Sequence, residues 1–155
     1  MKTTVLTFLT LLLFISNAFA QDYEDWFLEV LKKESPGELG YYMVSSPSCP
    51  FTKKEATKKI EGVFKKSGIK PLKDEYTLEK LYLSIAINCG KTSADNFLYF
   101  VDYGFGRRLP RPAVIFDNEA PSLWFGIGKK QTILNILETS AEEILVPYIK
   151  TNFDK

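Results

Sequence analysis

The sequence contains no histidine among its 155 residues. Histidine is the side chain that most often acts as a general base near neutral pH, and it is the commonest neutral metal ligand. Its absence excludes a histidine-containing catalytic triad, a histidine proton shuttle and zinc sites that need imidazole. We therefore predict no metal site, no cofactor and no catalytic residue.

Cysteine is also scarce, and its two copies, Cys49 and Cys89, are far apart. Residues 52–67 have the pattern of a helix and residues 80–89 that of a strand. If the strand returns antiparallel to the helix, its end meets the start of the helix and brings Cys89 beside Cys49. We predict one structural disulfide, with a redox pair or a metal site as the alternatives.

Only one long apolar run is present, at residues 5–15. Lys2 precedes it, and residues 16–20 follow with an Ala-x-Ala ending, which is the order of a cleavable signal peptide. We predict a signal peptide over 1–20, a new N-terminus at Gln21 and one domain over 21–155 that is secreted or periplasmic. A transmembrane anchor is the alternative, but the run is shorter than the roughly 20 residues of a membrane span.

The remaining chain alternates between helical and strand patterns. Thr52 and Glu55 have the spacing of a capping box, Gly68 suits a left-handed helix end, and Pro147 is expected to kink or split the last helix. We predict an α+β fold, in which an antiparallel meander sheet of about four to five strands packs against two or three helices. The expected helices cover 22–33, 52–67 and 130–150, and the expected strands cover 41–44, 81–89, 97–105, 114–116 and 123–127.

Arginine occurs three times, and all three copies lie in one short segment, as Arg107, Arg108 and Arg111. Guanidinium groups form bidentate hydrogen bonds with carboxylate and phosphate, which ammonium groups do not. The cluster suggests a contact with an acidic protein or another anionic partner. A charged loop that merely faces water is the alternative. With a net charge of +1, the chain lacks the basic excess of a nucleic-acid-binding protein.

The segment 97–105 is apolar on both faces of its expected strand, apart from Asp102. Such a strand is either covered on both sides or leaves one apolar face exposed. We predict a binding surface that joins the arginine loop to this strand, including Tyr103 and Phe105. The Gly126-x-Gly128 pair before the last helix has the form of an anion-binding turn, but strand exit and helix entry explain it equally.

Together these patterns predict a small exported protein that acts by binding rather than catalysis. Two other classes stay open. A carboxylate-dependent hydrolase would use Asp102, Asp117 or Glu119. An envelope structural protein would self-associate. The sequence does not predict the oligomeric state.

Overall fold

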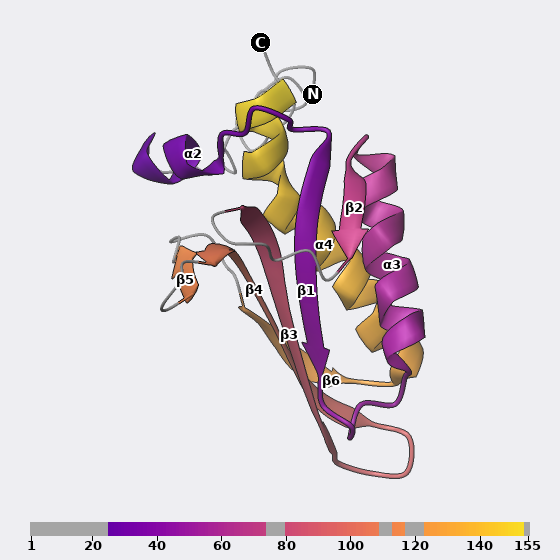
Figure 1. Ribbon diagram of the computed structural model, residues 1–155. Coiled ribbons are helices and arrows are strands. Elements are labelled where there is room, and N and C mark those ends of the chain that lie inside the picture. Colours follow the sequence, from indigo (N-terminus) through magenta and orange to yellow (C-terminus); the bar gives the residue numbers. More distant parts are fainter. Residues whose placement is uncertain (1–24, 74–79, 109–112, 117–122, 154–155) are drawn as a thin grey trace, which may run out of the picture.

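The computed structural model describes residues 25–73, 80–108, 113–116 and 123–153. The predicted signal peptide and the new N-terminus at Gln21 lie outside these ranges. In chain order the elements are α2 (Asp25–Leu31), β1 (Glu38–Ser45), α3 (Lys53–Lys66), β2 (Lys70–Lys73), β3 (Leu81–Lys91), β4 (Phe97–Arg108), β5 (Ala113–Phe116), β6 (Leu123–Gly128) and α4 (Lys130–Phe153) (Figure 1).

The six strands form one mixed sheet in the order β2-β1-β3-β4-β5, with β6 paired to another stretch of β4. Strand β1 is parallel to both β2 and β3, whereas β3, β5 and β6 each run antiparallel to their neighbour β4. The α+β class is therefore confirmed, but the purely antiparallel meander is wrong. The helix α3 acts as a crossover between β1 and β2, and a crossover of this kind makes its two strands parallel.

The prediction failed at β2, which is only four residues long and reads Lys-Pro-Leu-Lys. Two lysines and a proline in four residues give no strand signal. When β2 is overlooked, the sequence pattern runs directly from a helix into a set of consecutive hairpins. The presence of β2 places β1 between two parallel neighbours and moves the antiparallel pairing to the second half of the sheet.

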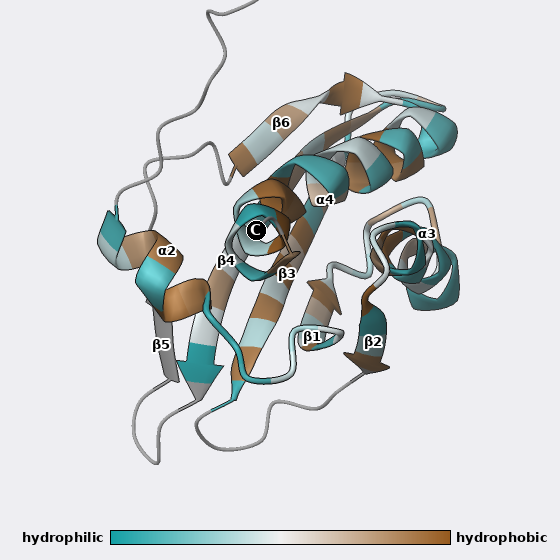
Figure 2. Cartoon of the chain, turned by 90° about the horizontal axis from the view of Figure 1, so that it is seen from above, coloured by the Kyte–Doolittle hydropathy of each residue, from teal (hydrophilic) through white to brown (hydrophobic). Residues whose placement is uncertain are grey.

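The helices described in the structure all pack on the same face of the sheet (Figures 1 and 2). Tyr41 of β1 contacts Phe64 of α3, with ring centroids 5.7 Å apart. Phe105 of β4 meets Phe27 of α2 and stacks on Tyr148 of α4. Because alternate side chains of a strand point to opposite faces, the odd-numbered residues of β1, β3 and β4 form the core and the even-numbered ones face away from the helices.

Helix α3 begins with the predicted capping box. The Thr52 hydroxyl accepts a hydrogen bond from the Glu55 amide, and the Glu55 carboxylate accepts one from the Thr52 amide at 2.9 Å. Its C-terminal end is also as predicted, with Gly68 at φ +71°. Helix α4 continues through the buried Pro147, so of the predicted kink or split the split is wrong and the kink stays a prediction.

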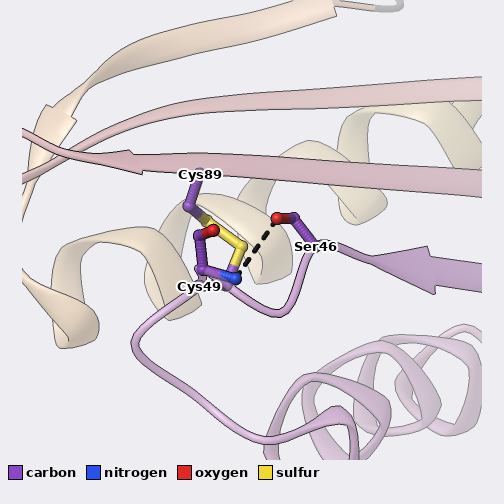
Figure 3. Close-up of a disulfide and its surroundings, with 4 residues drawn as sticks. Ser46, Cys49 and Cys89 are labelled. Carbon is purple, nitrogen blue, oxygen red and sulfur yellow. Dashed lines mark hydrogen bonds between the residues drawn. A yellow bond between two sulfur atoms is a disulfide. The ribbon is translucent and has the colours of Figure 1, made fainter.

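The predicted disulfide is present. Cys49 lies in the loop between β1 and α3, Cys89 lies near the end of β3, and their Cα atoms are 4.9 Å apart (Figure 3). The loop is also held by its backbone, since the Cys49 amide donates to the Ser46 carbonyl at 3.1 Å. As expected, the end of the strand meets the start of the helix, because β3 runs parallel to β1 and the crossover helix runs back against both.

Charged side chains join the two long helices along their exposed edges. Glu138 of α4 accepts hydrogen bonds from Lys59 and Lys66 of α3, the latter at 2.8 Å. These two ammonium groups lower the pKa of Glu138 from about 4.5 to about 2. At the other end of α3, Lys130 forms an ion pair with Glu55 at 2.7 Å.

Replacing Cys49 and Cys89 by serine should lower the free energy of unfolding by about 4 kcal/mol, because the bond closes a long loop in the unfolded chain. The two cysteines are 40 positions apart. Urea unfolding of the double variant and of the wild type, each with and without a reductant, measures the effect. Equal midpoints for the oxidised wild type and the variant would contradict the stabilising role.

Replacing Glu138 by glutamine should reduce the acid sensitivity of the protein. Because the pKa of Glu138 is lowered on folding, its ion pairs contribute stability above about pH 4.5 and lose it as the pH falls toward 2. The pairs are partly exposed, so we expect a contribution of about 1 kcal/mol at pH 7. Urea unfolding at a series of pH values compares Glu138→Gln with Glu143→Gln, an exposed glutamate of the same helix. A Glu138→Gln profile as steep as that of the control would contradict this role.

Candidate functional site: a basic cluster and an open sheet face

The structure places the two aromatic members of the predicted binding surface inside the core. Tyr103 and Phe105 are each only 1% exposed, so neither is available to a partner, and this part of the prediction is corrected. The Tyr103 hydroxyl donates to the Leu137 carbonyl of α4 at 2.9 Å, and burial raises the pKa of Tyr103. Both residues have odd numbers in β4 and therefore face the helices. The apolar sequence on both faces of this strand did not indicate which face was covered.

Of the three predicted arginines, the structure places the side chain of Arg107. This half-buried side chain donates from its guanidinium to the Val30 carbonyl of α2 at 3.2 Å, so it holds the end of β4 against that helix. Arg108 ends β4, and its side chain lies outside the described part of the structure, as does the whole of Arg111.

Lysines from other segments join Arg107. Lys33 follows α2, and its ammonium donates to the Glu38 carbonyl at the start of β1. Burial lowers the pKa of Lys33, and the positive charges of Lys80 and Arg107 lower it further, while Glu38 opposes them. We call Lys33, Lys70, Lys80 and Arg107 the basic cluster.

Among the described residues, the one carboxylate within the basic cluster, Glu38, is already engaged. Glu38 accepts a hydrogen bond from Lys70 at 2.7 Å, and this contact, together with the charges of Lys70, Lys33 and Lys80, lowers the pKa of Glu38. Among the described residues, three lysines thus act on Glu38 and Arg107 acts on Lys33, which leaves an excess of positive charge where β1 begins and β4 ends.

Sequence reasoning found only one member of this cluster. Its three lysines come from the segment after α2, the start of β2 and the residue before β3, and no spacing in the sequence relates them. The arginine run indicated Arg107, because arginine is so rare in this chain. The lysines become part of the site only through the parallel arrangement of β2, β1 and β3, which the sequence did not predict.

A second feature is the face of the sheet that points away from the helices. Large apolar side chains are exposed there, and we call them the open face: Val44, Leu98, Phe100, Leu123, Phe125 and Ile127. The rings of Phe100 and Phe125 stack across β4 and β6 with centroids 6.3 Å apart. Of the two alternatives for the strand at 97–105, the described residues favour the one that leaves an apolar face exposed.

Of the three carboxylates considered for catalysis, the structure describes only Asp102. Asp102 is exposed on the open face, whereas Asp117 and Glu119 lie outside the described ranges. Within those ranges no group of three or more histidine, cysteine or acidic residues could hold a metal ion. None of the helices described is both long enough and apolar enough to cross a membrane.

The two glycines before α4 have a steric explanation. A Cβ atom at Gly126 would lie 2.7 Å from the Tyr99 hydroxyl, and one at Gly128 would lie 2.9 Å from the Thr132 Cβ. Both glycines allow β6 to pass close to neighbouring side chains. The Gly126-x-Gly128 pattern is therefore accounted for by packing.

Comparisons with known proteins assign no family. No family model matches the chain, and no curated protein matches it. One solved structure that resembles it is a minor lipoprotein from Acinetobacter baumannii, with 7% sequence identity and a TM-score of 0.44. The alignment covers 72% of this chain and 90% of that one. A similarity at this level supports no conclusion about function.

Proposed function

We propose that this protein is an exported binding protein that holds an acidic protein partner at the basic cluster. The observation that carries the proposal is the imbalance of charge among the described residues there, since four cations accompany one carboxylate that is already paired with Lys70. Lys33 is partly buried, and a cation that has lost part of its hydration gains more from an incoming carboxylate than a fully hydrated one.

Export is supported by the disulfide. Bonds of this kind persist in oxidising compartments and are rare in the reducing cytosol. Cys49 and Cys89 are joined, and the described residues contain no free cysteine. In this proposal residues 1–20 are removed as a signal peptide, and the mature chain from Gln21 works as one domain in the periplasm or outside the cell.

The arginines that follow Arg107 fit the same proposal. Arg108 and Arg111 lie within four positions of it in the sequence, so they add cations to the same part of the chain. Guanidinium groups suit a carboxylate-bearing partner, because they bind both of its oxygens at once. The hydrolase alternative has less support, since Asp102, its one described candidate, is exposed on the open face.

Binding of a fluorescently labelled oligoglutamate peptide, followed by anisotropy, tests the proposal. The double variant Lys33→Gln and Lys80→Gln should bind the peptide about tenfold more weakly than the wild type, a loss of about 1.4 kcal/mol. The matched control removes the same charge from exposed lysines of α3, as Lys58→Gln and Lys65→Gln, and should keep the affinity of the wild type. Wild-type binding should also weaken as salt is raised.

Two results would overturn the proposal. One is equal peptide affinity for the cluster variant and the control variant, which would mean that only overall charge matters. The other is a peptide affinity that stays the same when salt is raised and also when Arg107, Arg108 and Arg111 are replaced together by glutamine. Circular dichroism of each variant establishes that it is folded, which matters for Arg107 because it also bonds to α2.

A further inference from the structure

The outer strands of the sheet differ in how well they are protected against pairing with another chain. An exposed edge offers free backbone N–H and C=O groups, and proteins usually protect it with lysine, proline or other charges. Strand β2 has this protection in Lys70, Pro71 and Lys73. Strand β6 reads Leu-Trp-Phe-Gly-Ile-Gly and contains neither a charge nor a proline.

Strand β6 is also the most apolar part of the open face. Among the described residues it pairs only with β4, so its other edge has no strand beside it (Figure 2). Leu123, Phe125 and Ile127 are 50%, 69% and 65% exposed, whereas Leu98 and Phe100 on β4 are 37% and 40% exposed. From β4 to β6, apolar exposure therefore increases toward the unprotected edge.

We propose that β6 pairs with β6 of a second copy of this chain, antiparallel and centred on Phe125, so that one sheet continues across a two-fold axis. In this register Phe125 lies opposite Phe125 of the second copy, and Leu123 lies opposite Ile127. All three exposed apolar side chains of one copy thus meet apolar side chains of the other. Because β6 has no charged residue, the pairing brings no like charges together.

The size of the contact fits a reversible dimer. If a large apolar side chain offers about 200 Å² when fully exposed, the three residues expose roughly 350 Å² per copy. Pairing through the edge covers the six-residue backbone edge and only the flanks of these side chains, so the buried area is below the roughly 1,200 Å² of a standard specific interface. We therefore expect a dimer that dissociates on dilution, with a Kd on the order of micromolar or weaker.

This inference goes beyond the proposed function and shares no residue with it. Strand β6 pairs with the first half of β4, whereas Arg107 lies five residues beyond Asp102, the last β4 residue paired with β6. That separation is roughly 17 Å along an extended strand. Loss of peptide binding and loss of dimers are therefore independent results, measured on different variants.

Sedimentation velocity of the purified full-length mature protein between about 1 µM and about 1 mM should show a shift from monomer to dimer. Phe125→Lys places two lysines opposite each other and should keep the protein monomeric over this range, as should Phe125→Glu. An equal mixture of the two variants should restore dimers, because lysine then faces glutamate. The matched control Phe100→Lys changes the stacking partner on the same face, one strand further from the edge, and should dimerise within about twofold of the wild type.

Several results would overturn the pairing. The first is a wild type that remains monomeric at every concentration. The second is a Phe125→Lys variant that dimerises as the wild type does. The third is a mixture of the two variants that fails to associate. An equal loss of dimerisation in Phe100→Lys and Phe125→Lys would indicate that two copies contact each other through the open faces of their sheets rather than through the edges. A different protein bound at β6 in the native extract would contradict self-pairing as well. If the lysine variant is unfolded by circular dichroism, Phe125→Ser replaces it and should weaken the dimer at least fivefold.

Discussion

The arrangement of this protein depends on one-sided packing, because all the described helices lie against the same face of one mixed sheet. Side chains alternate along a strand, so this packing divides each strand into a buried set and an outward set. Tyr103 and Phe105 belong to the buried set of β4, and Phe100 belongs to the outward set. The core, the open face and the failure of part of the predicted site all follow from this division.

The sequence was most informative where local chemistry determines structure. Thr52, Glu55 and Gly68 specify the two ends of α3 through contacts within a few residues, and these were predicted correctly. The disulfide was predicted because only two cysteines exist and a returning strand brings them together. Both successes depend on short-range geometry or on a very small number of possible pairs.

The sequence was least informative where pairing between distant segments determines the structure. The order of the strands depends on β2, whose Lys-Pro-Leu-Lys sequence resembles a loop and becomes a strand only by lying beside β1. The same pairing brings Lys70 to Glu38 and so helps to build the basic cluster. Arg107 could be singled out because arginine is rare here, but nothing in the sequence relates Lys33 to Lys80. A site assembled by strand order stays hidden until that order is known.

The position of the disulfide divides the fold into two parts of different character. The chain between Cys49 and Cys89 contains α3, β2 and nearly all of β3, so the sulfur bond closes a covalent ring around the crossover and the strand that completes the parallel half of the sheet. Parallel strands that are far apart in the sequence pair slowly, because the long loop between them must close before the contacts that stabilise it can form. Once the disulfide has formed, the chain between Cys49 and Cys89 is a closed loop, and fewer conformations are open to it. Strand β1 on the N-terminal side of the ring, and β4, β5, β6 and α4 on its C-terminal side, lie outside the ring and pack against it.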